Sequence, residues 1–258
     1  MRTQNVVMWL VSTGALFLGA CSHYTTPGGP ANFRALGITD SDVRANTDAT
    51  IAEKMAKKPL ATFPASIATV RVQGRGYRSH SVDGYGQGDF TVITVRDVET
   101  QEQLERLERL PMIREFVPLN RMVLTGAIYT EKNLREAAAN VHADMLAIYT
   151  FDTKFGRSTT IPYLGIITLG LFPNEQATVT STASAALIDT RNGYVYGVYE
   201  ATARKDRLTN AWSSEDAIDA ARRDAEAQAF DDLVTQFEQG WPRIVAQYGP
   251  PGAVAPGE

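Results

Sequence analysis

The sequence predicts an α/β fold, because patterns typical of strands alternate with patterns typical of helices from about residue 60 onward. The composition fits a folded body, since 44% of the 258 residues are hydrophobic and 21% are charged, the balance of an ordinary globular protein. This length suffices for one large domain or two small ones, and for a sizeable hydrophobic core.

The first residues are typical of an export signal. Arg2 is the only charged residue before Cys21, and residues 6–18 form an apolar run too short to cross a bilayer as a helix. The run ends in Leu18-Gly19-Ala20-Cys21, which resembles the bacterial lipobox. The resemblance implies that residues 1–20 are cleaved as a signal peptide and that Cys21 carries the lipid. An ordinary signal with an incidental cysteine is the alternative.

A lipid-anchored, flexible tether is expected over residues 21–47, because its first dozen residues are rich in Pro, Gly and hydroxyl side chains and have little to bury. The residue after the lipidation site is Ser22. In lipoproteins of enteric bacteria, which this segment resembles, an Asp at that position favours retention in the inner membrane. We therefore expect attachment to outer-membrane lipid through Cys21, with the protein facing the periplasm. A single α/β domain over residues 48–245 and a disordered, Pro- and Gly-containing tail over residues 246–258 complete the expected organisation.

Four helices are predicted from capping residues and apolar stripes of helical spacing. The predicted helices cover residues 48–58, the stretch between Thr100 and Pro111, residues 131–143, and a long final segment that begins at Ser213 or Ser214. The second has the clearest start, because Thr100 and Gln103 form a capping box ahead of Leu104, Leu107 and Leu110.

Strands are predicted where β-branched and aromatic residues gather. They cover residues 67–72, 90–95, 116–119, 145–151, 177–188 and 194–203. Pro118 favours an edge strand or a strand end for the third, and Asn192-Gly193 predicts a tight hairpin between the last two.

Several short motifs between residues 116 and 204 resemble the lipoprotein family of the curli-secretion channel, whose α/β domain is also found at the N-terminus of TolB and in lipoprotein activators of penicillin-binding proteins. These motifs are Val117-Pro118-Leu119-Asn120-Arg121, Ala143-Asp144 ahead of a buried strand, and Leu187-Ile188-Asp189-Thr190 followed by a Gly turn. The resemblance implies a TolB-N-terminal-like domain, with a single mixed sheet and helices packed on one side. None of the motifs is catalytic.

An apolar stretch at residues 161–172 is the first candidate contact surface. We expect it to cover the sheet as a loop; a hook for a partner protein or lipid surface is one alternative, and a membrane strand paired with residues 178–187 across a turn at residues 173–175 is another. The candidate contact residues there are Tyr163, Leu164, Ile166, Ile167, Leu169 and Phe172.

A Gly-rich loop at residues 73–89 is the second candidate, because it could present aromatic and cationic groups to a protein or glycan. Its candidate residues are Tyr77, Arg78, His80 and Tyr85. The alternative is a long solvated hairpin loop. A dinucleotide-binding fingerprint is excluded, since Ser79 stands where the third Gly is needed and no helix is predicted to begin there.

The function classes narrow by elimination. A net charge of -4 argues against nucleic-acid binding, and one Cys with three His excludes a Cys-based zinc site. Known catalytic and cofactor motifs are missing from the sequence, so we expect no cofactor and no enzyme. The sequence favours a non-catalytic binding or assembly module of the cell envelope, with an unidentified protein partner. A subunit of an oligomeric secretion channel and a periplasmic enzyme with an unrecognised carboxylate site remain alternatives, and self-association stays open.

Overall fold

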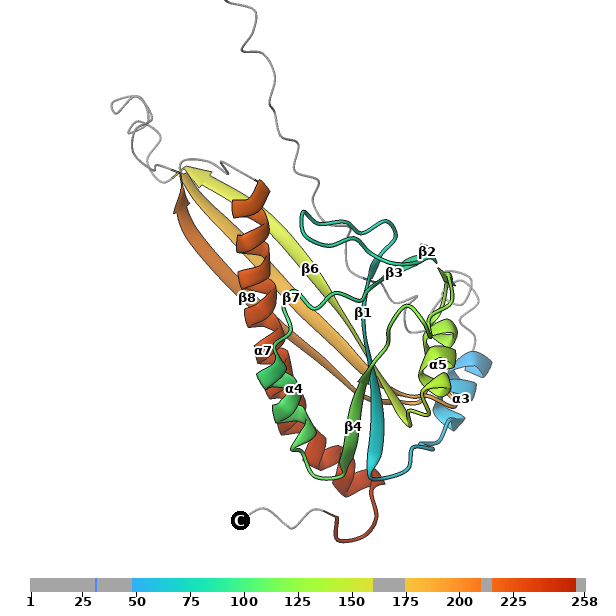
Figure 1. Cartoon of the computed structure of the whole chain (residues 1–258). Helices are drawn as coiled ribbons and strands as arrows, with labels where there is room; N and C mark the ends of the chain where they lie inside the picture. Colours follow the sequence, from blue (N-terminus) through green and yellow to red (C-terminus); the bar gives the residue numbers. More distant parts are fainter. Residues whose placement is uncertain (1–30, 32–47, 160–174, 210–214, 254–258) are drawn as a thin grey trace, which may run out of the picture.

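The computed structural model describes residue 31 and residues 48–159, 175–209 and 215–253. Its main feature is a six-stranded mixed sheet with helices against it (Figure 1). The strands of this sheet are β1 (Ala65–Gly74), β3 (Phe90–Ile93), β4 (Ile113–Pro118), β6 (Met145–Thr159), β7 (Glu175–Asp189) and β8 (Val195–Thr209). Two short strands, β2 (Gln87–Gly88) and β5 (Ala127–Ile128), pair separately. The helices are α3 (Asp48–Ala56), α4 (Gln101–Glu108), α5 (Glu131–Asn140) and α7 (Glu215–Tyr248).

The main sheet follows the order β3-β1-β6-β7-β8, and β4 also pairs with β1. The pairs of β1 with β4 and with β6 are parallel, and the others are antiparallel. β4 and β3 lie one after the other along the same edge of β1: β4 pairs with residues 65–69 and β3 with residues 71–74. The edge position expected from Pro118 is therefore confirmed.

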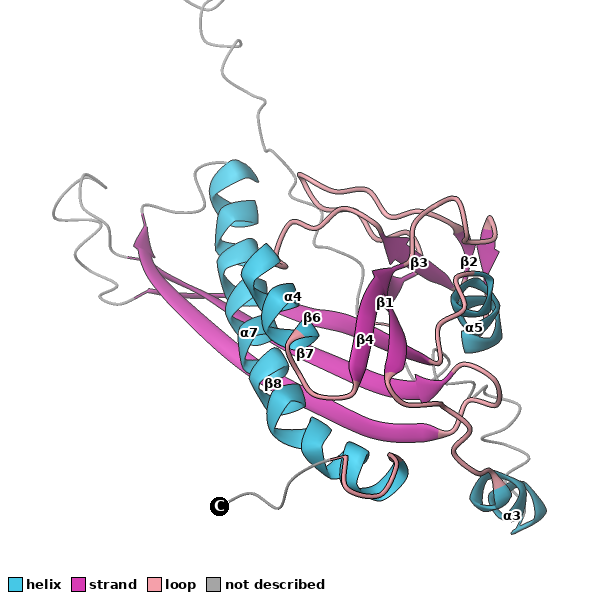
Figure 2. Ribbon diagram, turned by 60° about the horizontal axis from the view of Figure 1, so that its bottom comes forward, coloured by secondary structure: helices cyan, strands magenta, loops and turns pink. Residues whose placement is uncertain are grey.

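Both faces of the sheet are covered near β1, because its side chains point alternately toward two groups of helices. Val70 and Val72 pack in one cluster with Leu134 of α5, whereas Ile67 packs in another with Trp241 of α7. Helices α4 and α7 lie against the same face of the sheet (Figure 2). The expected α/β class with one mixed sheet is confirmed, but α5 lies on the face opposite to α4 and α7, so the helices do not all pack on one side.

The capping box predicted ahead of α4 is present. Thr100 Oγ1 accepts the backbone N–H of Gln103 at 3.2 Å, and Gln103 Oε1 accepts the backbone N–H of Thr100 at 2.9 Å. The third predicted helix ends earlier than expected, at Asn140 instead of residue 143, because His142 takes a φ of 55° that a helix cannot continue through. Helix α7 runs to Tyr248, three residues into the segment expected to be a tail.

The three strands β6, β7 and β8 are each 15 residues long and form an antiparallel meander. The predicted hairpin between the last two is confirmed, and Gly193 supplies the positive φ of 70° that its turn requires. Strand β6 extends to Thr159, eight residues beyond its predicted end. The length of these strands gives α7 a long surface to pack on.

Helix α7 approaches β8 closely at Gly240. A Cβ atom at that position would lie 2.8 Å from the ring of Tyr199, so any side chain there would force the ring to move. The next residue, Trp241, is fully buried and its Nε1 donates to the carbonyl of Pro111 at 2.7 Å. These contacts hold α7 against the sheet and the end of α4 against α7.

Candidate functional site

A cluster of charged side chains is buried between β1 and α7. Arg71 donates to Asp97 at 2.8 Å and to Glu226 at 2.9 Å, and Arg222 contacts the same two carboxylates at 2.7 Å and 2.6 Å. Arg71, Arg222 and Glu226 are almost fully excluded from solvent. Buried charges are tolerated only when they are paired and hydrogen-bonded, and this arginine–carboxylate cluster meets that condition.

The neighbours of the cluster hold its members in place. Thr153 on β6 donates to the second oxygen of Glu226 at 2.9 Å, and the guanidinium of Arg71 lies 4.6 Å above the ring of Phe151. Burial alone would lower the pKa of Arg71, but the negative charge of Glu226, together with smaller contributions from Tyr77, Glu99 and Asp97, more than offsets it, so the pKa lies above its usual value. Arg71 therefore stays charged and acts as a permanent cross-link between strand and helix.

A third carboxylate, Asp219, extends the cluster along α7. Arg222 Nε contacts it at 2.9 Å and Arg223 contacts it at 2.9 Å. Burial opposes the ionised form of Asp219, but hydrogen bonds from Arg222 and Ser81 outweigh that effect and hold the pKa of the carboxyl below its usual value. Asp219 is thus ionised at neutral pH.

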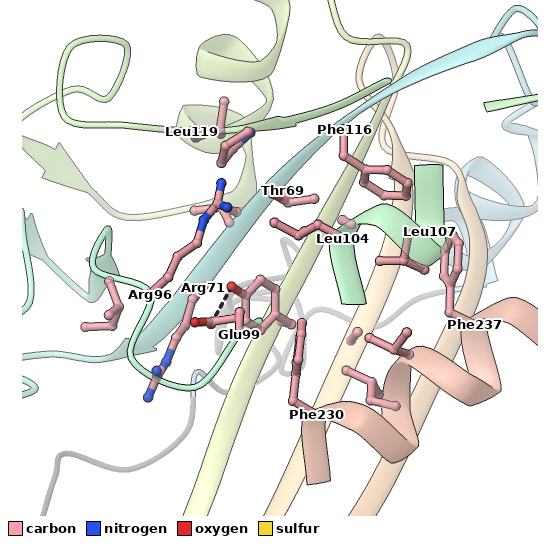
Figure 3. Close-up of a pocket in the computed structure, with 18 of the residues that line it drawn as sticks. Thr69, Arg71, Arg96, Glu99, Leu104, Leu107, Phe116, Leu119, Phe230 and Phe237 are labelled. Atoms are coloured by element: carbon pink, nitrogen blue, oxygen red, sulfur yellow. Dashed lines mark hydrogen bonds between the residues drawn. The ribbon is translucent and has the colours of Figure 1, made fainter. Parts of the chain in front are cut away.

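A cavity of about 90 Å³ lies next to this cluster, between the sheet and the helices α4 and α7 (Figure 3). Most of its wall is aliphatic or aromatic, from Leu104, Leu107, Phe116, Leu119, Phe230, Leu233, Val234 and Phe237. Polar groups enter it from Arg71, Arg96, Glu99 and Tyr149. An apolar cavity with a few converging polar groups is the usual form of a small-molecule binding site.

Glu99 and Tyr149 form the polar contact inside this cavity. The Tyr149 hydroxyl donates to Glu99 Oε1 at 2.7 Å, and burial together with the neighbouring Glu99 carboxylate raises the pKa of Tyr149 well above its usual value. Tyr149 is therefore a fixed donor. The other carboxylate oxygen, Glu99 Oε2, is buried and has no hydrogen-bond partner among the described residues.

The Gly-rich loop at residues 73–89 is folded onto the body of the domain. This contradicts the alternative that the whole loop is solvated. Tyr77 is 3% exposed, packs with Val82 and Ile93, and accepts a hydrogen bond from Arg71 Nη2 at 3.3 Å. The prediction that Tyr77 contacts a partner is wrong, because its ring belongs to the core.

The other three residues expected from this loop do reach the surface. Arg78 is exposed and pairs with Asp83 at 3.0 Å, and His80 Nε2 lies 2.8 Å from Asp216. Tyr85 is half-buried beneath the guanidinium of Arg121, 5.2 Å from its ring centre. None of the three lines the cavity.

The carboxylate pairs needed for general acid–base catalysis do not meet in the cavity, where Glu99 is the only carboxylate among the described lining residues. The pair of His80 and Asp216 lies on the surface, with side chains 40% and 84% exposed.

Cys21 and the apolar stretch at residues 161–172 lie outside the described residues, and so do its candidates Tyr163, Leu164, Ile166, Ile167, Leu169 and Phe172. The hairpin proposed as a membrane element also required residues 178–187 as its second strand. Those residues belong to β7, which pairs with β6 on one side and β8 on the other. That pairing contradicts the hairpin.

The sequence pattern pointed to the strand that carries Arg71 but not to the ion pairs. Arg71 interrupts a run of β-branched residues, and Asp219, Arg222 and Glu226 follow one another at helical spacing inside the apolar stripe of α7. Charged residues at positions predicted to be buried are the signal that could have revealed the cluster. Glu99 gave no such signal, because it precedes a helix cap where acidic residues are common.

Within the described ranges, no three His, Cys, Asp or Glu side chains converge as a metal site would need. The described helices include none that combines the length and apolarity needed to cross a membrane. Ala31 is described within the expected tether, and its backbone N–H donates to Thr150 Oγ1 at 2.9 Å, so the chain touches the sheet at that point.

Comparison with known proteins found no matching family model and no curated relative. Among solved structures, the chain is similar to a lipoprotein from Neisseria meningitidis, with 14% identity, a TM-score of 0.31, and coverage of 64% of this chain and 99% of the other. A Xanthomonas campestris protein from a family of unknown function has 12% identity, a TM-score of 0.32, and coverage of 73% and 90%. The structural neighbours thus include a bacterial lipoprotein, and likeness at this level leaves the function to be argued from the chain's own residues.

Proposed function

We propose that this chain is a periplasm-facing lipoprotein of the outer membrane whose α/β domain is a non-catalytic binding module of the cell envelope. The observation that carries the proposal is the cavity between α4, α7 and the sheet, whose largely apolar wall also includes Arg71, Arg96, Glu99 and Tyr149. The resemblance of Leu18-Gly19-Ala20-Cys21 to a lipobox supports this location. The motifs that resemble those of the curli-secretion channel, TolB and penicillin-binding-protein activator families support a role in envelope assembly.

The mechanism is tethering. Acyl chains contribute about 0.8 kcal/mol for each buried CH₂, so a triacylated Cys21 holds the domain on the membrane almost permanently. Confinement to a thin layer raises the effective concentration of the domain for partners in the same layer. A binding site of modest affinity is then sufficient.

Expression of the full chain in a Gram-negative host tests the location. We expect mass spectrometry to find a mature N-terminus at Cys21 that carries acyl groups, and fractionation to place the protein in the outer membrane. The Cys21→Ser variant should leave that fraction, and Ser22→Asp should move the protein to the inner membrane. An unmodified Cys21 thiol on the mature chain would refute the anchor.

Crosslinking in intact cells tests the binding role. Envelope proteins crosslinked to the wild-type domain should be lost, or reduced at least tenfold, in the Cys21→Ser variant at equal abundance. Equal crosslinking by the two forms would show that tethering is not the mechanism.

A further inference from the structure

We infer that helix α3 lies on an anionic phospholipid surface and sets the orientation of the domain on the membrane. This inference rests on the proposed attachment through Cys21 and goes beyond it, because an acyl anchor on a tether leaves the domain free to turn. Three observations carry it: α3 covers no part of the core, it presents apolar and cationic side chains together, and the chain on either side of it is fixed to the body.

The first observation is that α3 buries no side chain within the described structure. It is nine residues long and none of its residues is buried. In Figure 2 it protrudes from the body and covers neither face of the sheet. Isolated helices shorter than about 12–15 residues are marginal in water, and most helices in proteins are stabilised by the packing of one face. A further surface is therefore needed to hold these residues in a helix.

The second observation is the apolar face of α3. Ile51 and Met55 lie one helical turn apart on the same face, and they are 55% and 80% exposed. Ala52 lies beside them and is also exposed. Large apolar side chains that share an exposed face indicate a contact with a protein or with lipid. The charges around them favour lipid.

Lysines surround the end of this helix. Lys54 lies in its last turn, and Lys57 and Lys58 follow it closely. All three are exposed, and none of their ammonium groups pairs with a carboxylate among the described residues. Residues 48–58 carry these three lysines and two acidic residues, whereas the chain as a whole has a net charge of -4. An anionic bilayer therefore repels the whole chain but attracts this end of it.

A phospholipid bilayer supplies both parts of the required contact. Its acyl region accepts Ile51 and Met55, and its phosphate groups attract the lysines, whose long stems can follow apolar surface while the ammonium groups stay at the headgroups. Short amphipathic helices with lysines beside the apolar face bind the membrane interface in this way. We name the set of Ile51, Lys54, Met55, Lys57 and Lys58 the α3 surface.

The third observation begins on the N-terminal side of α3. The backbone N–H of Ala31 donates to Thr150 Oγ1 at 2.9 Å, and Cys21 precedes Ala31 by ten positions. Ten residues span at most about 35 Å. An acylated Cys21 thus keeps the bilayer within that distance of Thr150.

The chain that follows α3 is fixed to the turn between β7 and β8. Asn192 Nδ2 donates to the carbonyl of Lys58 at 2.7 Å, and the backbone N–H of Leu60 donates to Asp189 at 2.8 Å. A contact of α3 with the bilayer is therefore transmitted to the sheet and fixes how the domain faces the membrane.

Tethering lowers the affinity that the α3 surface needs. The acyl anchor already holds the domain in a thin layer, so the contact of α3 with lipid has a high effective concentration. Two large apolar side chains and three lysines then suffice to favour one orientation.

Hydrogen–deuterium exchange followed by mass spectrometry tests the inference on the full, acylated chain in nanodiscs. One preparation contains phosphatidylcholine alone, and the other contains phosphatidylcholine with added phosphatidylglycerol. We expect the amides of α3 to exchange at least tenfold more slowly in the anionic nanodiscs, and the amides of α4 to exchange equally in both. High salt should remove most of the difference, because exposed charges are screened.

Two variants separate the apolar from the cationic part of the contact. Met55→Gln removes an apolar side chain, and the joint replacement Lys54→Gln, Lys57→Gln and Lys58→Gln removes the charge. Each should abolish most of the added protection. Gln, Met and Lys have similar helix propensities, so the loss would not come from a weaker helix. Met122→Gln, the same change at a residue that is 91% exposed outside α3, should have no effect.

Equal exchange of α3 in the two kinds of nanodisc, which is the result expected if a protein covers α3 instead, would overturn the inference. Protection that both α3 variants retain would also overturn it. The intact mass of the same sample reports the acylation of Cys21. An acylated chain without protection of α3 would therefore refute the α3 contact and leave the proposed location standing.

Discussion

Arg71 of β1 and Glu226 of α7 are separated by 155 positions in the chain and form a buried ion pair of 2.9 Å. This contact joins the centre of the sheet to the longest helix. It depends on two further groups, because Asp97 also contacts Arg71 and Arg222 also contacts Glu226. Arg222 and Asp97 contact each other as well. The cluster therefore acts as a unit in which each charge is compensated by its neighbours.

Replacement of one member should strongly destabilise the domain. Glu226→Gln leaves Arg71 and Arg222 buried with Asp97 as their remaining shared carboxylate, and loss of one partner from a buried pair costs about 3–5 kcal/mol. Urea unfolding followed by circular dichroism measures the difference. Glu136→Gln at an exposed position of α5 is the control, and a loss below about 0.5 kcal/mol in the Glu226 variant would show that the cluster carries no stability.

Asp144 should make the stability dependent on acid pH. Burial disfavours its charged form, but hydrogen bonds from Thr62, the Ser66 backbone and Arg191 outweigh that effect and lower its pKa below the usual 3.8. A lowered folded-state pKa gives stability that is complete above the unfolded value and is lost as pH falls through the folded value.

Unfolding free energies measured between pH 5 and pH 2 test this prediction. The wild type should lose more stability over that window than Asp144→Asn, which cannot titrate. Identical slopes for the two proteins would contradict the role of Asp144. Asp219 shifts in the same direction, so some acid dependence should remain in the variant.

Gly240→Ala should lower the thermal stability, against the usual gain from this change inside a helix. The added Cβ would lie 2.8 Å from the Tyr199 ring, and overpacking of this kind costs about 1–3 kcal/mol. Differential scanning calorimetry reads the change in Tm. Gly126→Ala, where a Cβ would meet nothing within 4 Å, is the matched control, and the second change Tyr199→Leu should recover part of the loss. A higher Tm for Gly240→Ala would refute the close approach.

Thr100→Ala should cost about 1 kcal/mol, the usual value for loss of an N-cap side chain. Thr100 accepts from Gln103 in the capping box of α4, and α4 forms part of the cavity wall through Leu104 and Leu107. Thr100→Ser keeps the hydroxyl and should retain the wild-type stability. Equal losses from both substitutions, measured by chemical denaturation, would indicate that the methyl group and not the hydrogen bond matters.

The sequence by itself determined the local elements. The capping box at Thr100 and the turn at Gly193 involve residues only a few positions apart, so both can be recognised from the sequence without any knowledge of the fold. Strand β6 was predicted only as far as residue 151 because polar residues such as Asp152 and Lys154 follow, and their pattern does not distinguish an exposed strand from a loop.

The tertiary structure alone decided the contacts that make the candidate site. The burial of Tyr77, the placement of α5 on the face opposite α7, and the meeting of Glu99 with Tyr149 all join segments distant in sequence or depend on how those segments pack. Hydrophobic periodicity specifies that a face is buried but not which face of which partner covers it, since burial of apolar area has no direction. The direction comes from the pairing of strands and the close approach of helices, and these exist only once the chain is folded.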